Sequence, residues 1–232
     1  RTKPIVIVQQ TWSAGDHLVA REDIKNINDL KGKKIALQQG GPHSILIDDA
    51  LKAAKMNWDD IEVVYTADLS GPNGPATLFK NDPSIVACCT ITPDMIGLCS
   101  GIDSVGSGAE GTVKGAHVVV STAQMSRSIA DVWVVRKDWY SQNIDFVNNF
   151  VAGYLRATED VVAMRNNFSK TSELNNDYKE VLQLAQNIFT KDILPTLEED
   201  AHGLLSDATF AGLPGNIAFF TDETNVSGFD AK

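Results

Sequence analysis

Apolar and polar residues alternate along the first two thirds of the chain in a way that is typical of α/β proteins. Short apolar runs predict strands, and between them apolar residues recur with helical spacing. The predicted strands cover residues 5–9, 34–38, 61–66, 85–90, 117–121 and 131–136. The intervening pattern predicts helices over 44–56 and 94–99. Strands separated by helical crossovers favour a largely parallel sheet.

The last third of the chain has a different pattern, which predicts helices. Residues 143–165 keep apolar positions at a sustained i, i+3, i+4, i+7 spacing, so we expect a long amphipathic helix there. Two further helices are predicted over 175–190 and 195–207, with Pro195 limiting continuation between them. A segment punctuated by glycine and proline, residues 212–215, follows them.

Two segments indicate where the chain passes between lobes. Gly15 follows the first predicted strand, and a polar stretch at 126–130 leads into the strand at 131–136. If both are crossovers, residues 1–29 and 126–232 form one lobe and residues 30–125 form the other. We expect the ligand cleft between these lobes.

Charge and composition narrow the kinds of partner. The formal net charge is -10, so the overall field repels nucleic-acid phosphates and an anionic membrane surface. No stretch approaches the roughly 18 consecutive apolar residues of a membrane span. Cys88, Cys89 and Cys99 are too few and too clustered for a disulfide framework, so we expect buried free thiols.

The strongest local signal is the segment that follows the predicted strand 34–38. Gly40 and Gly41 let the backbone approach a ligand closely, and a helix that starts near Pro42 points its amide groups toward an anion. His43 lies at that helix start and is a candidate ligand contact. The alternatives are a plain strand-to-helix turn and a surface histidine. The glycine spacing matches neither the dinucleotide fingerprint nor the phosphate loop.

Thr11, Trp12 and Ser13 end the first predicted strand. Their hydroxyls could donate hydrogen bonds to a small ligand, and the Trp12 ring could cover it. Equally, Trp12 could fill the core under a hinge.

Two other turns carry candidates. Thr92 and Asp94 begin a predicted helix, where the alternative role is an N-cap. Ser126 and Arg127 stand near the second crossover, and a guanidinium has the fork geometry that suits a carboxylate or sulfonate. The alternative for Arg127 is a structural salt bridge.

Templates for catalysis and metal binding are not matched. The four histidines, at positions 17, 43, 117 and 202, include no His-x-x-x-His pair, and the three cysteines lack the spacing of a zinc site. No Gly-x-Ser-x-Gly elbow occurs. We therefore expect no catalytic residue, no metal site and no cofactor.

The chain resembles the nitrate/sulfonate/taurine-type periplasmic binding proteins of ABC importers. The resemblance begins at TWSAGDHLVA, residues 11–20, and DLKGKKIA, residues 29–36, and continues through residues 41–43, 110–116, 129–136 and 215–220. It implies a two-lobed type 2 periplasmic-binding-protein fold, with mixed, mainly parallel sheets flanked by helices and two hinge crossovers. Such proteins close on a ligand by hinge motion and make or break no bond.

The resemblance also implies a site, partners and a location. The family's contacts fall here on Thr11, Trp12, Ser13, Gly40, Gly41, His43, Thr92, Asp94, Ser126 and Arg127. The implied partners are a small anion or zwitterion and the membrane permease of an importer, with the protein a periplasmic or lipid-anchored monomer. Relatives carry an opening βαβ segment before Ile5 and a further stretch after Phe229, so we expect this chain to be incomplete at both ends.

Two alternatives stay open. Thiamin-pyrimidine synthases share the two-lobed fold and link a cysteine-rich motif to iron, of which Cys88 and Cys89 are the only hint here. The other alternative is a ligand-sensing regulatory domain. The residues do not identify the solute, because nitrate, sulfonates, taurine, bicarbonate and heteroaromatic precursors are all bound within the wider group.

Overall fold

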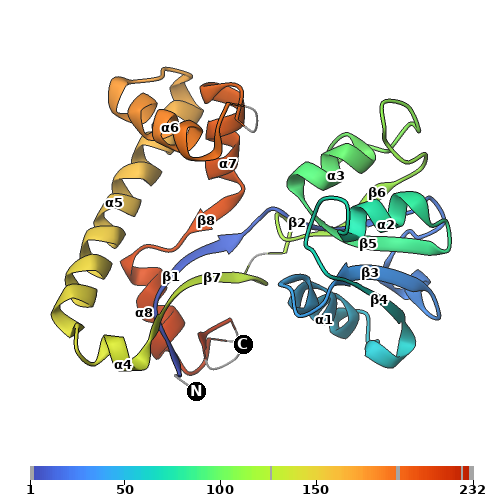
Figure 1. The fold of residues 1–232 in the computed structure, drawn as a ribbon, viewed down its shortest axis with the longest axis horizontal. Coiled ribbons are helices and arrows are strands. Elements are labelled where there is room, and N and C mark those ends of the chain that lie inside the picture. Colours follow the sequence, from blue (N-terminus) through green and yellow to red (C-terminus); the bar gives the residue numbers. More distant parts are fainter. Residues whose placement is uncertain (1–2, 126, 192–193, 226, 230–232) are drawn as a thin grey trace. The chain divides into compact units, whose positions relative to one another are not determined.

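The computed structural model describes residues 3–125, 127–191, 194–225 and 227–229, and the chain forms two compact units (Figure 1). We call Ser13–Ile129 the inserted unit, because both of its ends connect to the other one. Arg1–Trp12 and Ala130–Lys232 make up the discontinuous unit. Each unit has its own sheet and its own helices.

The inserted unit is built on a mixed five-stranded sheet of order β4-β3-β5-β2-β6. Its strands are β2 (Asp16–Ala20), β3 (Lys34–Gln38), β4 (Glu62–Thr66), β5 (Ile85–Ile91) and β6 (His117–Ser121). Strand β3 is parallel to β4 and β5, whereas β2 is antiparallel to β5 and β6. The carboxyl ends of β3 and β5 therefore meet the start of β2 at one edge of the sheet.

Helices cover both faces of this sheet. They are α1 (His43–Ala53), α2 (Pro75–Asn81) and α3 (Thr92–Cys99), with the 3-10 turns η1 (Ile27–Leu30) and η2 (Trp58–Asp60). Leu18 of β2 packs in a core cluster with α1, while its neighbour Val19 packs in a second cluster with α2 and α3. All five residues of β2 are buried, as expected for a strand covered on both sides.

The strands predicted from the sequence are confirmed to within about four residues at each end, but β2 was missed. Its sequence, DHLVA, opens with two polar residues and does not alternate, because both faces of the strand are buried. Helix α2 was also missed, since its seven residues are too few for a helical period to show.

The unit boundaries differ from the lobes predicted from the sequence. The chain divides after Trp12 and after Ile129, so residues 13–29 lie in the inserted unit and not with the first strand. The reason is β2, which is hydrogen-bonded on both sides within the five-stranded sheet.

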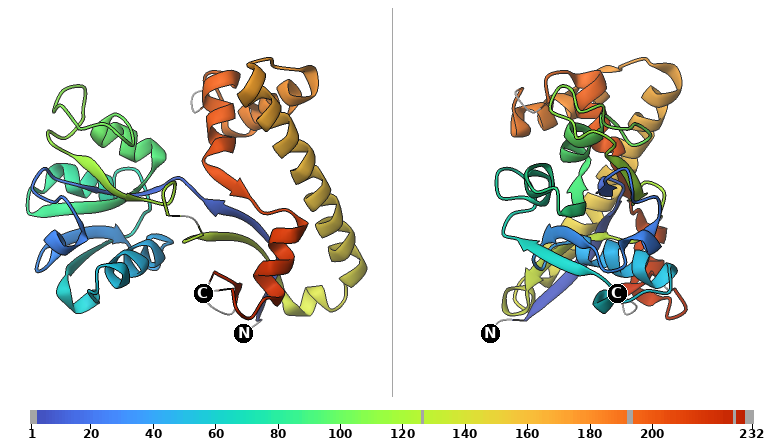
Figure 2. Two further views of the ribbon diagram at one scale, coloured as in Figure 1. Left: turned by 180° about the vertical axis from the view of Figure 1, so that it is seen from behind. Right: turned by 90° about the vertical axis from the view of Figure 1, so that its right-hand side faces the viewer.

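The discontinuous unit has a three-stranded sheet of order β7-β1-β8. The strands are β1 (Pro4–Ser13), β7 (Ala130–Arg136) and β8 (Ala208–Phe210), and β1 pairs antiparallel with β7. The helices are α4 (Lys137–Tyr140), α5 (Ile144–Thr171), α6 (Asn176–Phe189), the short π-helix η3 (Leu197–Ala201), α7 (His202–Ser206) and α8 (Leu213–Thr221). Figure 2 shows α5 running along the length of this unit.

The predicted long helix is confirmed as α5, which continues to Thr171, and the helix predicted over 175–190 is confirmed as α6. The helix predicted over 195–207 is divided, because a π-turn precedes the short α7. Tyr178 and Leu182 of α6 form the centre of a small core here. Among the helices of the described residues, none combines the length and apolar character needed to cross a membrane.

Candidate functional site

Polar side chains gather where β3 and β5 end and β2 begins. In the sheet register His17 of β2 lies opposite both Thr90 of β5 and Ser121 of β6, so these three side chains share one face. We call the following residues the polar edge: Asp16, His17, His43, Thr90, Thr92, Asp94 and Ser121. All of them belong to the inserted unit.

Asp16 is held by contacts from three parts of the chain. Its Oδ1 lies 2.8 Å from Nε2 of His43, and its Oδ2 accepts a hydrogen bond from the Ser13 hydroxyl. Its backbone amide donates to Oγ1 of Thr122 at 3.0 Å. Burial alone would raise the pKa of Asp16, but the contacts with His43 and Ser13 outweigh burial and hold the pKa below its usual value. Asp16 is therefore ionised at neutral pH.

His17 lies between two hydroxyl groups. Its Nδ1 is 2.9 Å from Oγ of Ser121, and its Nε2 is 3.1 Å from Oγ1 of Thr92. Burial lowers the pKa of His17 to about 4, although the nearby Asp16 carboxylate opposes this shift. The imidazole is therefore neutral at pH 7, and it ties the start of α3 to the sheet.

Three buried polar atoms of the polar edge have no hydrogen-bond partner within the described part of the chain. They are Oγ1 of Thr90, Nδ1 of His43 and Oδ2 of Asp94. His43 and Thr90 are fully buried, and Asp94 is partly buried. Burial raises the pKa of Asp94, and the proximity of His43 opposes that shift. Unpaired buried polar groups are costly, so a cluster of them is typical of a site that a ligand or water completes.

The glycine turn places the start of α1 beside this edge. Gly40 has a φ of +66°, which favours glycine, and a Cβ on Gly41 would lie 2.5 Å from Oε1 of Gln38. Helix α1 begins at His43, with Pro42 at the N-cap, and α3 begins at Thr92. Within the described residues neither helix has a side-chain cap, so both carry positive partial charge at their starts.

The structure brings together several of the site residues predicted from the sequence. Ser13, His43 and Thr92 contact Asp16 or His17, and Asp94 lies close enough to His43 to change its own pKa. His43 is buried, so the surface alternative for it is wrong. Thr92 and Asp94 also begin a helix, as the N-cap alternative supposed, but neither provides a side-chain cap for it.

Thr11 and Trp12 belong to the discontinuous unit, where both have partners. The Thr11 hydroxyl donates to Oδ2 of Asp131 at 2.5 Å. The Trp12 ring packs edge-on against Phe219, with 5.8 Å between ring centroids. These contacts match the alternative in which Trp12 packs in a core, and a ligand role for either residue stays a prediction.

The structure gives less support to the two ligand contacts predicted at the second crossover, Ser126 and Arg127. Ser126 lies outside the described residues. Arg127 is exposed, has a φ of +69° and forms no ion pair with any described residue. The salt-bridge alternative is thus not seen in the described part of the chain, and the ligand role of Arg127 stays a prediction.

Sequence reasoning missed four members of the polar edge: Asp16, His17, Thr90 and Ser121. Asp16 and His17 lie within the TWSAGDHLVA segment, three and four residues after the candidate Ser13, and this closeness in sequence could have pointed to them. Thr90 and Ser121 end predicted strands, and only the pairing of β2 with β5 and β6 brings them to His17.

The cysteines are buried free thiols, as predicted. Cys88 and Cys89 lie in different core clusters on opposite faces of β5, so their thiols point apart. Burial raises the pKa of both thiols, which disfavours the thiolate needed for nucleophilic attack or metal binding. No group of three or more potential metal-ligating side chains occurs among the described residues.

Comparisons with known proteins agree with this architecture. The family model described as NMT1/THI5 like matches residues 3–73. A search of curated proteins finds no match.

Solved structures extend the likeness beyond the matched segment. The periplasmic aliphatic sulphonate binding protein SsuA from Escherichia coli aligns over 89% of this chain and 60% of its own, with 15% identity and a TM-score of 0.57. A periplasmic sulfonate-binding protein SsuA from Methylobacillus flagellatus KT aligns over 75% of this chain and 46% of its own, with 19% identity and a TM-score of 0.50. The matched part of the chain thus spans less than two thirds of either relative.

These comparisons establish the fold and test the resemblance seen in the sequence. Both sheets carry helices, and their α/β arrangement matches that of solved periplasmic binding proteins. The chain has the type 2 periplasmic-binding-protein fold, and its resemblance to the nitrate/sulfonate/taurine-type periplasmic binding proteins is confirmed.

Proposed function

We propose that this protein is the extracytoplasmic solute-binding component of an ABC importer, and that it binds a small anionic or zwitterionic solute at the polar edge. The observation that carries the proposal is the set of unpaired buried atoms on Thr90, His43 and Asp94. His43 begins α1 and Asp94 lies in the first turn of α3, two helices that lack side-chain caps within the described residues, and Thr90 lies near the end of β5. Fixed polar groups in a buried setting bind a ligand without first reorganising.

The importer role rests on the fold and on what the similar proteins are named for. Both SsuA proteins are described as periplasmic sulfonate-binding proteins. By analogy, we infer a sulfonate-, taurine- or nitrate-like solute, a membrane permease as partner, and a monomer that is periplasmic or lipid-anchored. That the ligand also meets residues of the discontinuous unit remains a prediction from the sequence.

An enzyme of the thiamin-pyrimidine-synthase type is the second candidate, because the matched family model includes THI5-like proteins. The burial and raised pKa of Cys88 and Cys89 weigh against a cysteine-based iron site. Metal analysis of the purified protein distinguishes the two roles. Bound iron that is lost in Cys88→Ser would overturn the receptor proposal.

A thermal-shift screen tests the receptor proposal directly. A solute that binds only the folded protein stabilises it by about 2.7 kcal/mol at a hundred times its Kd, so Tm must rise. We expect a rise with at least one of nitrate, taurine, an alkanesulfonate or bicarbonate in the unaltered protein. His43→Ala should reduce that shift, because it removes a buried member of the polar edge.

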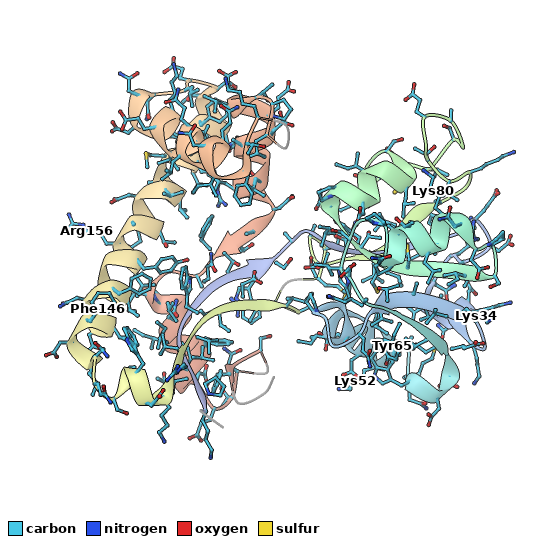
Figure 3. All side chains as sticks on the ribbon, in the orientation of Figure 1. Lys34, Lys52, Tyr65, Lys80, Phe146 and Arg156 are labelled. Carbon is cyan, nitrogen blue, oxygen red and sulfur yellow. The ribbon has the colours of Figure 1, made fainter. Side chains whose placement is uncertain are left out.

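The matched control is Lys80→Ala, at an exposed position of α2 in the same unit and labelled in Figure 3. This variant should keep the full shift. If none of these small solutes raises the Tm of the unaltered protein, the transport-receptor proposal fails.

A further inference from the structure

His43, at the start of α1, is paired on one side of its ring only. Its side chain is fully buried, and its Nε2 lies 2.8 Å from Oδ1 of Asp16. Nδ1, the second ring nitrogen, is also buried and has no hydrogen-bond partner in the described part of the chain. The ring thus has an acceptor for one of its nitrogens and lacks a partner for the other.

This arrangement favours a neutral imidazole as long as no ligand is bound. A neutral ring carries one proton, which Nε2 donates to the Asp16 carboxylate, and it keeps a lone pair on Nδ1. An imidazolium carries a second N–H on Nδ1, and a charged N–H that is buried without an acceptor is costly. The missing partner of Nδ1 therefore keeps the second proton off the ring.

An anion that reaches Nδ1 would meet negative charge unless a cation accompanies it. Asp16 is ionised, and no lysine or arginine of the described residues forms an ion pair with Asp16 or Asp94. The uncapped start of α1 supplies only partial positive charge. The lone pair of a neutral His43 would also repel the ligand. A proton on Nδ1 removes both conflicts, because it adds a positive charge and turns the lone pair into a donor.

We propose that His43 takes up a proton when an anion binds at the polar edge, and that the resulting imidazolium is the cation of the site. The buffer gives up this proton to the Nδ1 lone pair. The new Nδ1–H donates to the anion, while Nε2–H stays paired with Asp16. Each ring nitrogen then faces one negative group, which strengthens both contacts. The inference rests on the proposed function and adds that ligand binding is linked to proton uptake.

The titratable groups that neighbouring elements place around this pair leave one competitor for the proton. Burial lowers the pKa of His17 on β2 to about 4, so this ring stays neutral near pH 7. Burial raises the pKa of the Cys89 thiol on β5, so it is neutral as well. Burial also raises the pKa of Asp94 on α3, and His43 opposes that shift. Among these three groups, only Asp94 shifts toward taking up a proton near neutral pH.

The charged groups of α1 and of its neighbour β3 have partners of their own. Asp48 pairs with Lys52, Asp49 accepts a hydrogen bond from Ser128, and Lys34 pairs with Glu62. A carboxylate that already has a donor or a cation beside it resists protonation near pH 7. Arg127 is exposed, and an arginine stays charged throughout this range, so it takes up no proton.

Calorimetric titrations of the whole chain measure the proton uptake. The probes are nitrate, ethanesulfonate and taurine, which exchange almost no proton with water at about pH 7.3. Bis-Tris and Tris both buffer at this pH, bring no competing oxoanion and differ in their heat of ionisation, so the difference in binding heat gives the number of protons. We expect about 0.5–1 proton per bound anion, and a Kd that rises about threefold to tenfold from about pH 7 to about pH 8.

His43→Gln removes the titrating group and keeps an amide N–H for Asp16. This variant should take up less than about 0.2 proton and bind about tenfold more weakly, with a Kd that hardly changes with pH. The control is His117→Gln, which removes another histidine of the same unit, one whose Nδ1 contacts the carbonyl of Gly115 at 3.1 Å. It should keep both the affinity and the proton uptake. The melting temperature of each ligand-free variant shows that it is folded.

The ring nitrogen shifts of the unaltered protein give a second readout, which does not require any variant to bind. The His43 signals are those that His43→Gln lacks, and they should change from a neutral ring to an imidazolium when a probe is added. An unchanged ring, or measurable binding without proton uptake, overturns the inference and leaves the receptor role standing.

Two further outcomes would also count against His43. Proton uptake that persists in His43→Gln overturns the inference, and its loss in Asp94→Asn would then place the proton on Asp94. Failure of all three probes to bind overturns it as well. The receptor proposal falls only if no solute of the thermal-shift screen raises the Tm, so the two failures are distinguishable.

Discussion

The two sheets of this protein are covered very differently. In the inserted unit, α1 covers one face and α2 and α3 the other, so residues of β2 and β3 are buried on both sides. In the discontinuous unit, a cavity of about 720 Å³ opens over β1 and α5. A second cavity, of about 250 Å³, is lined by residues that include Trp133 and Phe150.

The difference also appears in the exposure of apolar side chains. In the discontinuous unit, Trp133 and Val134 of β7 are 42% and 49% exposed, and Phe146 of α5, labelled in Figure 3, is 62% exposed. The polar edge, by contrast, stands mainly on β2, where all five residues are buried, and on β5, where five of the seven are buried. Buried, well-packed strands hold side chains in fixed rotamers. The inserted unit is therefore the better scaffold for a site whose binding groups must keep fixed distances from one another.

The largest effect that follows from this comparison is expected for a pair of leucine-to-alanine substitutions. Leu37→Ala, in the fully buried centre of β3, should lower the free energy of unfolding by about 2–5 kcal/mol, because it leaves a cavity in a packed core. Leu213→Ala should cost less than about 1 kcal/mol, since Leu213 is 51% exposed and lines the open cavity. Urea unfolding measures both, and equal costs would contradict the difference in packing between the units.

The next effect is a pH dependence that arises in the inserted unit. Burial lowers the pKa of folded His17 to about 4, whereas an unfolded histidine titrates near 6.5, so the unfolded chain binds the extra proton between these values. Stability should therefore fall by about 1–3 kcal/mol as the pH drops from 6.5 to 4. His17→Gln should flatten the curve of unfolding free energy against pH in this window.

His202→Gln measures how much the discontinuous unit contributes to the pH dependence of the unfolding free energy. Burial also lowers the pKa of His202, which is hydrogen-bonded at Nδ1 to the Tyr178 hydroxyl at 2.8 Å. Its loss should flatten the curve less than the loss of His17 does, because His202 is less buried. A pH dependence that survives in His17→Gln would show that the groups responsible lie elsewhere.

The glycine turn should show a moderate effect confined to the inserted unit. Gly40→Ala should cost about 1 kcal/mol, because alanine is strained at a φ of +66° even though no atom lies within 4 Å of the added Cβ. Gly203→Ala, where the added Cβ also meets open space but φ is not in the left-handed region, should cost nothing or stabilise α7. Thermal unfolding compares the two variants, and equal Tm values would remove the conformational argument for Gly40.

The smallest effect on stability is expected at the exposed apolar face of the discontinuous unit. Phe146→Ser should change the unfolding free energy by less than about 0.5 kcal/mol yet reduce binding of a hydrophobic dye, because Phe146 belongs to a contiguous apolar surface. Val105→Ser removes an isolated apolar side chain, 64% exposed, from the inserted unit and should leave dye binding unchanged. A similar loss of dye signal in both variants would show that the apolar surface is not concentrated in one unit.

The elements whose pattern is local could be predicted from the amino-acid residues alone. The periodicity of residues 143–165 predicted α5, and the apolar runs predicted β3, β4 and β5, because an amphipathic helix or a short buried run shows its own period or length. The glycine pair and Pro42 likewise indicated the turn into α1.

Features that depend on pairing between distant segments became visible only in the folded chain. Strand β2 has no pattern of its own, and its place between β5 and β6 moves the unit boundary to Trp12. The same pairing joins His17 to Ser121 across 104 positions and brings Asp16 to His43. Such contacts form because two strands share hydrogen bonds and both faces are buried, and no local sequence pattern encodes them.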